Sequence, residues 1–258
     1  MLDFGFYNMD CLEGMRQFPD NYFELAIVDP PYGDGGGYLD ERNEVRTTIR
    51  QIPRTGFRGK TYPGGSPDTN RGGSRHYTFG ARKSSRTYQD RRNLGEQIRK
   101  KIIAWDVAPD QSYFDELFRV SRNQVIWGGN YFHLPPTRCF LVWRKLTISE
   151  KFSMAMAEYA WTSFNSNAKV FEHVPQDNTG QRFHPTQKPV ALYKWILSNY
   201  AKPGDKILDT HVGSASSLIA CYDLGFDYVG FEIDEEYYKL ASKRLEEVTA
   251  QIRMDLQL

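Results

Sequence analysis

This sequence of 258 residues has few cysteines, no long apolar run and almost no excess of one charge over the other. Three cysteines are too few for a disulfide framework, and the first residues contain no basic patch followed by an apolar run. The strongest apolar stretches have the length of a strand, far below the roughly 18 residues of a membrane helix. These absences exclude membrane proteins and secreted disulfide scaffolds, and they predict a reduced, cytoplasmic setting.

The composition is that of one ordinary globular domain. Apolar residues make up 40% of the chain, and 33 basic side chains face 32 acidic ones for a net charge of +1. Its five histidines and three cysteines are scattered without the spacing of a zinc site. We therefore expect residues 1–258 to form a single domain that binds no metal.

Charge is distributed unevenly along the chain despite the small total. Residues 41–101 contain 16 Lys and Arg against 5 Asp and Glu, a net charge of +11, so the rest of the chain carries −10. The segment is rich in Gly, Ser, Thr and Pro and poor in aliphatic residues, which predicts a largely irregular insertion. Composition leaves two interpretations open, a solvated linker or a surface that binds phosphates with its cations and stacks rings on bases.

Outside this segment, apolar strands alternate with helices. Strands are expected over 4–8, 24–28, 124–127, 140–143, 206–208 and 228–231. Helices are expected over 11–18, 111–120 and 216–224, from Pro189 to the break at 202–204, and after the N-cap Asp234. This alternation predicts an α/β domain with a doubly wound, mostly parallel sheet that binds ligands beyond the carboxyl ends of its strands.

One candidate ligand site follows the strand at 206–208. Residues 209–216 read Asp-Thr-His-Val-Gly-Ser-Ala-Ser, and Glu232 ends the next strand 23 residues after Asp209. Small residues let the backbone approach a ligand, and a carboxylate at that spacing can accept hydrogen bonds from both hydroxyls of a ribose. The pattern predicts a nucleoside site and fits a nicotinamide cofactor equally well. In isolation it also fits a tight turn followed by an ordinary surface glutamate.

A second candidate site, Asp29-Pro30-Pro31-Tyr32, comes directly after the buried strand at 24–28. The prolines fix the backbone, so the Asp29 carboxylate and the Pro30 carbonyl can both accept from a planar amine while the Tyr32 ring stacks on it. An exocyclic amine of a nucleobase has its lone pair delocalised into the ring, and two fixed acceptors favour the pyramidal nitrogen that can attack. In isolation the tetrapeptide also fits a strand terminator with a solvated aspartate.

Together these motifs resemble the amino-group DNA methyltransferases that use S-adenosylmethionine. The motif order is that of the permuted beta class, in which the catalytic motif precedes the cofactor motif, and it implies a Rossmann-like fold. The chain has Thr210, His211 and Ala215 where that family usually has Pro, Phe and Gly. Six motifs carry the resemblance: Asn8 to Leu12, Asp29 to Tyr32, Trp127 to Phe132, Trp143 to Lys145, His184 to Pro189 and Asp209 to Ser216.

The resemblance implies roles for individual residues. The catalytic set would be Asp29, Pro30, Pro31 and Tyr32, with Asp29 and the Pro30 carbonyl as acceptors for the amine and Tyr32 as the stacking wall. The residues implied for S-adenosylmethionine are Asp10, Cys11, Thr186, Lys188, Asp209, Gly213, Ser214 and Glu232. Among these, Asp10 and Cys11 would lie near the adenine of the cofactor, Glu232 on its ribose, and Thr186 and Lys188 near its methionine end.

The resemblance also implies DNA, duplex or single-stranded, as the partner. Asp29 favours the N6 amine of adenine, since this family pairs Asp there with adenine and Ser with cytosine. The target base must be flipped or already unpaired. If about five cations of the insertion contact phosphates, binding falls with salt at a logarithmic slope of about −4 to −5. The basic residues expected at DNA are Arg58, Lys60, Arg71, Arg75, Arg82, Lys83 and Arg86.

Several alternatives stay open from the sequence. The same site would serve N4-cytosine methylation in DNA or adenine methylation in RNA. A protein that binds nucleic acid without catalysis is an interpretation of another class, because of the changes at 210, 211 and 215. A nicotinamide dehydrogenase is the weakest alternative, since it gives Asp29 to Tyr32 no function.

Residues 147–182 are the expected target-recognition region. Relatives of this kind suggest that the chain forms a homodimer and acts with a cognate restriction nuclease. No feature of the sequence bears on either expectation.

Overall fold

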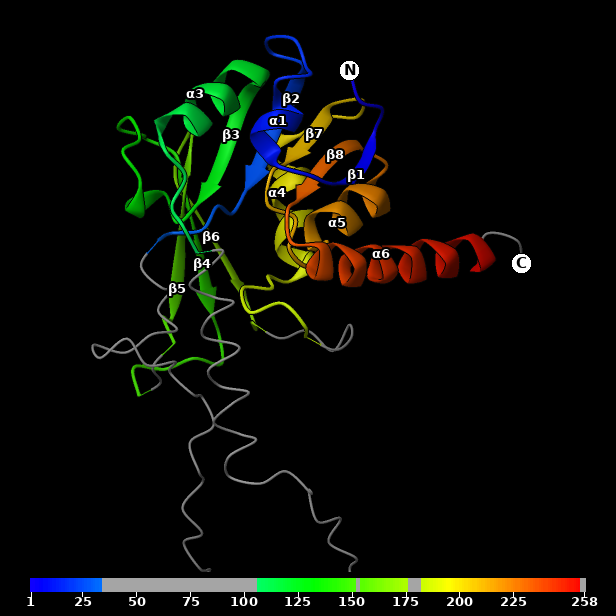
Figure 1. Cartoon of the computed structure of the whole chain (residues 1–258). Helices are drawn as coiled ribbons and strands as arrows, with labels where there is room; N and C mark the ends of the chain where they lie inside the picture. Colours follow the sequence, from blue (N-terminus) through cyan, green and yellow to red (C-terminus); the bar gives the residue numbers. More distant parts are fainter. Residues whose placement is uncertain (34–105, 152–153, 176–181, 256–258) are drawn as a thin grey trace, which may run out of the picture. The chain divides into compact units, whose positions relative to one another are not determined.

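An eight-stranded sheet organises the part of the chain that the structure, a computed structural model, describes (Figure 1). The described residues are 1–33, 106–151, 154–175 and 182–255. The basic insertion expected at 41–101 lies outside these residues, and so do the seven DNA-contacting residues expected within it. Within the described part, no helix has the length and apolarity needed to cross a membrane.

The strands are β1 (Gly5–Asn8), β2 (Phe23–Val28), β3 (Ser121–Trp127), β4 (Phe140–Lys145), β5 (Ala157–Thr162), β6 (Lys169–His173), β7 (Lys206–Asp209) and β8 (Asp227–Glu232). The helices are α1 (Cys11–Met15), α3 (Gln111–Val120), α4 (Val190–Tyr200), α5 (Ser216–Leu224) and α6 (Glu235–Asp255), with a short 3-10 turn, η1 (Gly129–Tyr131), after β3. The expected helices and strands are therefore present, although the helix expected over 11–18 ends at Met15.

The strand order is β1-β8-β7-β2-β3-β5-β4-β6. Every pair in this order is parallel except the two that β5 makes with β3 and β4. The ends of the other seven strands therefore emerge at one edge of the sheet, which we name the carboxyl edge, and β5 begins at that edge. The opposite side is the amino edge. The strand order changes direction between β7 and β2, and ligands bind at such points in open α/β sheets.

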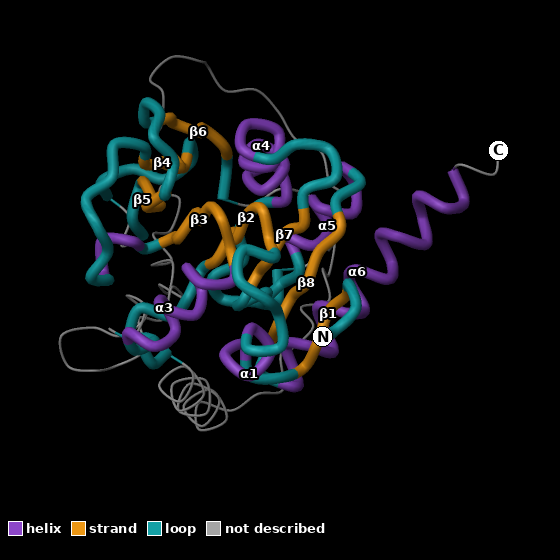
Figure 2. Tube along the Cα trace, turned by 90° about the horizontal axis from the view of Figure 1, so that it is seen from above, coloured by secondary structure: helices purple, strands orange, loops and turns teal. Residues whose placement is uncertain are grey.

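Helices cover both faces of the sheet, with α4 and α5 on one side and α1 and α3 on the other (Figure 2). The central strand β2 shows why. Its sequence is an almost continuous apolar run, as expected of a strand buried on both faces. Leu25 and Ile27 pack with the core under α4 and α5, while Ala26 and Val28 pack with the core under α1 and α3.

Local sequence sets the helix ends. The Asp10, Asp110 and Asp234 side chains each accept hydrogen bonds from the first backbone N–H groups of α1, α3 and α6. Helix α5 ends at Gly225, whose φ of +74° lies in the left-handed region that glycine adopts at little cost. The expected N-cap at Asp234 and the expected helix end at residue 224 are thus confirmed.

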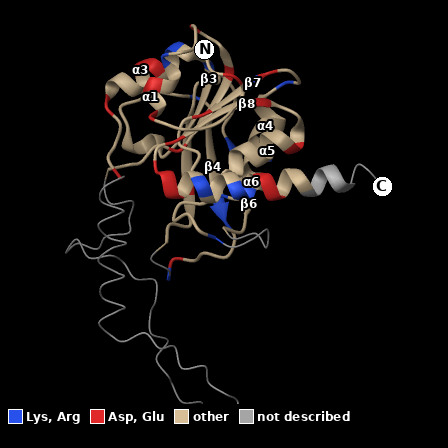
Figure 3. Cartoon of the chain, turned by 45° about the vertical axis from the view of Figure 1, so that its right-hand side comes forward, with Lys and Arg blue, Asp and Glu red and all other residues tan. Residues whose placement is uncertain are grey.

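Helix α6 presents both signs of charge along its exposed side (Figure 3). Lys239 pairs with Glu235 at 2.5 Å and Lys243 with Glu247 at 3.9 Å, each one helical turn apart. Such pairs support a solvated helix by a few tenths of a kcal/mol, about 0.2–0.5 each. We assign this surface a structural role.

The strands β5 and β6 were not expected from the sequence. Both fall within residues 147–182, the expected target-recognition region, and both belong to the central sheet. Local pattern does not indicate them, because β5 mixes polar and apolar residues and every residue of β6 is at least partly exposed. The described residues left outside strands in that region are 147–151, 154–156, 163–168 and 174–175. Target recognition by 147–182 stays a prediction.

Candidate active site

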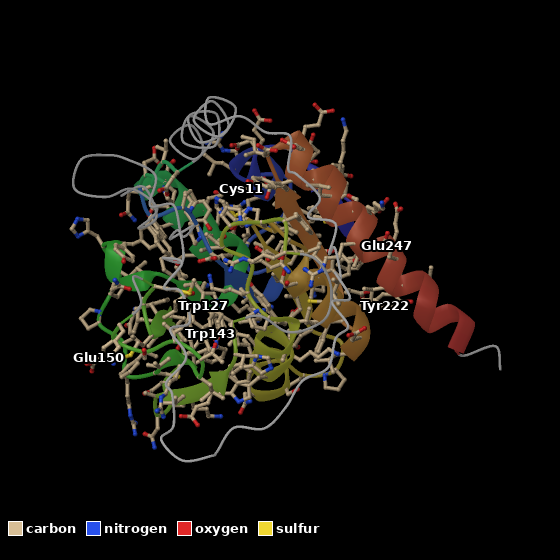
Figure 4. All side chains as sticks on the ribbon, turned by 90° about the horizontal axis from the view of Figure 1, so that it is seen from below. Cys11, Trp127, Trp143, Glu150, Tyr222 and Glu247 are labelled. Atoms are coloured by element: carbon tan, nitrogen blue, oxygen red, sulfur yellow. The ribbon has the colours of Figure 1, made fainter. Side chains whose placement is uncertain are left out.

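The predicted site residues gather at the carboxyl edge of the sheet. Asp10 follows β1 and Asp29 follows β2, while Asp209 and Glu232 are the last residues of β7 and β8. Because these four strands are mutually parallel neighbours, residues 10, 29, 209 and 232 emerge at the same edge. Cys11, which begins α1 beside Asp10, is labelled in Figure 4.

Asp29 and Tyr32 form the centre of the site. The Tyr32 hydroxyl donates to Asp29 Oδ1 at 2.9 Å, and the Asp29 side chain is 12% exposed. The Tyr32 ring stacks on Tyr131, with centroids 4.6 Å apart and planes 12° from parallel. Pro30 is buried and Pro31 is half-buried between them in sequence. A carboxylate acceptor and an aromatic face therefore lie together, as the motif predicts.

Gly128 makes room for the Tyr32 ring. This residue follows β3 with a φ of +67°, and a Cβ atom there would lie 2.1 Å from Tyr32 Cε1. A larger residue would displace the ring and would also be strained in the left-handed region. The Gly128-Gly129-Asn130 turn is thus a support of the site, a role that the sequence did not reveal.

Lys188 contacts Asp29 from the segment before α4. Its Nζ donates to Asp29 Oδ2, forms a second ion pair with Glu158 Oε2 at 3.3 Å, and lies 5.4 Å from the centre of the Trp127 ring (labelled in Figure 4). Glu158 Oε1 pairs in turn with Lys145 Nζ at 2.5 Å. The role predicted for Lys188 at the methionine end of a cofactor stays a prediction.

The pairing controls the ionisation of these groups. Burial alone would lower the pKa of Lys188, but Asp29 and Glu158 raise it above its ordinary value. Burial would raise the pKa of Glu158, but Lys188 and Lys145 lower it. Lys188 and Glu158 are therefore both charged at neutral pH, because each opposite charge outweighs the loss of solvation.

Glu232 ties the loop at 210–215, which we name the cofactor loop after the predicted motif, to the end of β8. Its Oε2 accepts from the Gly213 N–H and its Oε1 from the Asp234 N–H, both at 2.9 Å. A carboxylate has about four lone-pair sites, so acceptor capacity remains for a ligand such as a ribose hydroxyl. Gly213 has a φ of +56°, and the neighbouring Ser214 is buried, with its hydroxyl 3.1 Å from that of Ser216.

Asp209 is buried under the same loop. It accepts from the Ser217 hydroxyl and, at 3.0 Å, from the His211 N–H. Burial raises the pKa of Asp209 to about 7, these two hydrogen bonds lower it, and the charges of Asp29 and Glu232 raise it further. The three carboxylates are thus close enough to interact, and because Lys188 pairs only with Asp29 among them, the repulsion between Asp209 and Glu232 favours a positively charged ligand.

The three departures from the family pattern form their own contacts. Thr210 Oγ1 lies 2.6 Å from the Tyr113 hydroxyl and 2.9 Å from His211 Nδ1. Burial lowers the pKa of His211 to about 4, so this ring is neutral at pH 7. Ala215 adopts a left-handed φ of +62° at the start of α5, the conformation that glycine would take there. The substitutions thus preserve the loop.

The remaining predicted cofactor residues line the same edge. The Asp10 carboxylate caps α1, and burial followed by the charge of Asp10 raises the pKa of the Cys11 thiol to about 12. Thr186 Oγ1 lies 3.1 Å from His184 Nδ1. A Cβ on Gly213 would lie 3.1 Å from the His184 ring, so the segment before α4 meets the cofactor loop.

Sequence reasoning missed five residues that build the site: Tyr113, Gly128, Tyr131, Lys145 and Glu158. In the sequence Lys145 stands out only as part of a strand motif, and Glu158 falls in the region expected for target recognition. A charged residue flanked by strand-forming residues was the available signal for Glu158, because a charge in a strand needs a partner.

Comparison with known proteins identifies the family. The profile of the N6/N4 methyltransferases, described as DNA methylase, matches residues 78–243, well over half of the chain. The chain belongs to the N6/N4 DNA methylases. The type II methyltransferase M2.MboI of Moraxella bovis is 23% identical over 269 residues, which cover 96% of this chain and 89% of the relative.

Other DNA methylases are similar over different lengths. The type II methyltransferase M.HpaI of Haemophilus parainfluenzae is 38% identical over 81 residues, 31% of this chain and 26% of the relative. The M1.HpyAVI–SAM complex aligns with 93% of this chain and 98% of its own, at 17% identity and a TM-score of 0.45.

The N6/N4 DNA methylases take their methyl group from S-adenosylmethionine, which is therefore the cofactor of this chain. The chemistry of the carboxyl edge fits it, since Asp209 and Glu232 suit a sulfonium cation and Glu232 retains acceptor capacity for a ribose hydroxyl. Among the residues described, no group of three or more His, Cys, Asp or Glu side chains is arranged to hold a metal ion.

Proposed function

We propose that this chain methylates the N6 amine of adenine in DNA. The observation that carries the proposal is the Asp29 carboxylate placed beside the Tyr32 ring and held by Lys188. A planar amino base that stacks on Tyr32 would bring its exocyclic nitrogen to an acceptor. Because Asp29 has about four lone-pair sites and two are in use, it can accept an N–H of the base as well.

The chemistry required of the protein is positioning. In the proposed reaction, Asp29 and the Pro30 carbonyl accept the two N–H groups and hold the nitrogen so that its lone pair is available. That lone pair forms the new bond to the methyl carbon, the carbon–sulfur bond breaks, and its electron pair stays on sulfur. The amine then releases one proton to solvent. Such alignment and charge placement supply most of the catalysis in a transfer of this kind.

Individual cofactor contacts are part of the proposal. We assign the ribose hydroxyls to Glu232, and the surrounding contacts to Asp10, Cys11, Thr186, Lys188, Asp209, Gly213 and Ser214. Support comes from the clustering of these residues at one edge and from the acceptor capacity that Glu232 retains. S-adenosylmethionine supplies the methyl group and a positive charge that the carboxylates attract.

The target base must leave the duplex stack to reach Tyr32, at a cost of roughly a few kcal/mol. We propose that the basic residues Arg58, Lys60, Arg71, Arg75, Arg82, Lys83 and Arg86 bind the phosphates of duplex or single-stranded DNA and repay part of this cost. The named relatives are type II methyltransferases. We therefore place this chain in cytoplasmic DNA modification beside a restriction nuclease.

Methyl-labelled S-adenosylmethionine tests the proposal. The purified protein is incubated with duplex DNA, single-stranded DNA or RNA, and the labelled nucleoside is identified after digestion. Label in N6-methyladenine from DNA, lost in Asp29→Ala, is the expected result. Label in N4-methylcytosine would keep the mechanism and overturn the choice of base, while label in RNA alone would overturn the choice of polymer.

A second measurement separates the enzyme from a non-catalytic binder. Titration calorimetry with S-adenosylmethionine should give one site per chain, weakened at least about 10-fold in Glu232→Gln by loss of a charge-assisted hydrogen bond. No binding of cofactor together with tight binding of DNA would contradict the proposed function.

A further inference from the structure

Four side chains of alternating charge run along the carboxyl edge of the sheet, from β4 near one side to the proposed catalytic carboxylate after the central strand β2. Lys145 at the end of β4 pairs with Glu158 near the start of β5, Glu158 with Lys188, and Lys188 with Asp29. We name this set the Lys145–Asp29 relay. Its members come from four separate segments of the chain, so the contacts arise only when the sheet and the segment before α4 are assembled.

Burial makes each member dependent on its neighbours. The side chains are 3% exposed for Lys188, 7% for Lys145, 12% for Asp29 and 27% for Glu158. A buried ammonium without a carboxylate is strongly unfavourable, so neither lysine can leave its partner. Two positive and two negative charges cancel, which lets the relay sit in the interior without a net charge.

The relay also fixes the orientation of the Asp29 carboxylate. Lys188 holds Oδ2, and the Tyr32 hydroxyl holds Oδ1. Rotation about the last side-chain bond of Asp29 would break both contacts. Lys188 is itself held from the far side by Glu158, at 3.3 Å, and Glu158 by Lys145. The direction in which Asp29 presents its remaining lone pairs is therefore set by Tyr32 on one side and by Lys188, with Glu158 and Lys145 behind it, on the other.

We propose that Lys188, anchored by Glu158 and Lys145, is a positioning residue that aims the Asp29 carboxylate at the target amine. This inference rests on the proposed function. The rival interpretation is an ion pair that only attaches α4 to the sheet. The rival interpretation predicts that variants of Lys188 lose stability and that kcat recovers when stability is restored. The relay predicts that kcat stays low even when stability is restored.

Lys188→Met separates the two interpretations. Its expected kcat for methyl transfer, measured at saturating S-adenosylmethionine, is about 10²-fold lower, the cost of a misplaced reacting group, while the KM for DNA changes little. Since Lys188 lowers the pKa of Glu158, its removal lets Glu158 keep a proton to higher pH. Because Glu158 lies in the same chain of contacts, the acid limb of the kcat profile should move to higher pH.

A triple variant provides the deciding comparison. Lys188→Met combined with Glu158→Gln and Lys145→Met leaves only Asp29 charged, so no buried ammonium is left without a carboxylate. We expect this protein to regain most of the melting temperature lost by Lys188→Met, while its kcat stays about 10²-fold below that of the native chain. Recovery of kcat together with melting temperature would overturn the proposal, because the lysine would then be only structural.

Two single variants complete the design. Glu158→Gln keeps the Lys188–Asp29 contact and should lower kcat about 10-fold, as loss of an outer support does in other sites. Lys206→Met is the matched control, because Lys206 pairs with Glu24 at 3.1 Å at the amino edge. It should keep the native kcat and acid limb. An unchanged kcat in Glu158→Gln would contradict the relay, and absence of methyl transfer by the native chain would overturn the proposed function as well.

Discussion

The two edges of the sheet use charge in opposite ways. At the amino edge, Glu24 pairs with Lys206 at 3.1 Å and lies 3.9 Å from Arg122, and Arg119 pairs with Asp20 at 2.7 Å. Burial would raise the pKa of Glu24, but hydrogen bonds and charge from Lys206 lower it. The amino edge thus joins opposite charges and stabilises the fold.

At the carboxyl edge opposite charges pair within the Lys145–Asp29 relay, but beside the relay the carboxylates of Asp209 and Glu232 lie close to that of Asp29. Burial and the neighbouring charges of Asp29 and Glu232 raise the pKa of Asp209 to about 7, and burial raises that of Glu232. Holding these groups together costs folding free energy, which the amino edge and the core offset. The contrast teaches that stability and the proposed chemistry are assigned to opposite ends of the same strands, so variants can separate them.

The largest expected effect is that of Asp29→Asn on methyl transfer. The amide keeps the shape of the side chain but loses the charge and half of the acceptor sites, so kcat should fall about 10³-fold. The same chemical change at the amino edge, Glu24→Gln, should leave kcat within about two-fold. Initial rates with labelled S-adenosylmethionine measure both, and equal losses would break the contrast between the edges.

The next effect is on stability in Asp209→Asn. The pKa of this carboxyl is about 7 when folded and 3.8 in the ordinary state, so the folded chain binds the extra proton between these values. The free energy of unfolding of the native chain should therefore fall as pH rises from 4 to 7. The variant has no such proton to lose, so its free energy of unfolding should rise relative to that of the native chain by about 2 to 4 kcal/mol over this range. Urea unfolding at pH 4 and pH 7.5 measures the gain, and a constant difference would contradict it.

Gly128→Ala should reduce both activity and stability. A Cβ there would meet the Tyr32 ring at 2.1 Å, and the left-handed φ adds about 1 to 2 kcal/mol of strain. Gly204→Ala is the matched control, since Gly204 has a φ of +89° before β7 and, within the described part of the chain, a Cβ atom there would meet no atom of a non-adjacent residue within 4 Å. Both variants should lose stability in thermal melts through backbone strain, Gly128→Ala more because of the overlap with Tyr32, and methyl transfer should fall only in Gly128→Ala.

The smallest effect is that of Glu24→Gln on stability. Its lowered pKa means that Glu24 stabilises the folded chain above pH 4.5, and this contribution disappears as pH falls through the folded value. We expect a loss of about 1 kcal/mol at pH 7 and almost none near pH 3, as for a partly exposed ion pair. Urea unfolding at the two pH values measures it, and a loss at pH 3 as large as that at pH 7 would contradict the assignment.

Much of the parallel half of the sheet could be predicted from sequence. Strands such as β2 and β7 are short apolar runs that end in a carboxylate, and α5 stops at Gly225, so local pattern is sufficient there. The strands β5 and β6 could not be predicted in the same way. Their place depends on pairing with β3 and β4, a non-local choice that is not encoded in alternation within a few residues.

The candidate site follows the same division. Asp29, Asp209 and Glu232 stand at the ends of predicted strands, so their common edge follows from topology. The contact between Lys188 and Asp29 joins residues 159 positions apart, and its anchor Glu158 lies on an unpredicted strand. Long-range ion pairs of this kind appear only when the packing of the segments is known.

The direction of β5 has a consequence for engineering. Because this strand runs against its neighbours, it offers its beginning at the carboxyl edge, and Glu158 there is paired in register with Trp143 of β4. The counterion of Lys188 is thus held by backbone hydrogen bonds and not by a loop. Chimaeras that exchange the connection 146–156 should therefore retain their catalytic geometry, which makes this connection a favourable crossover site for modular redesign.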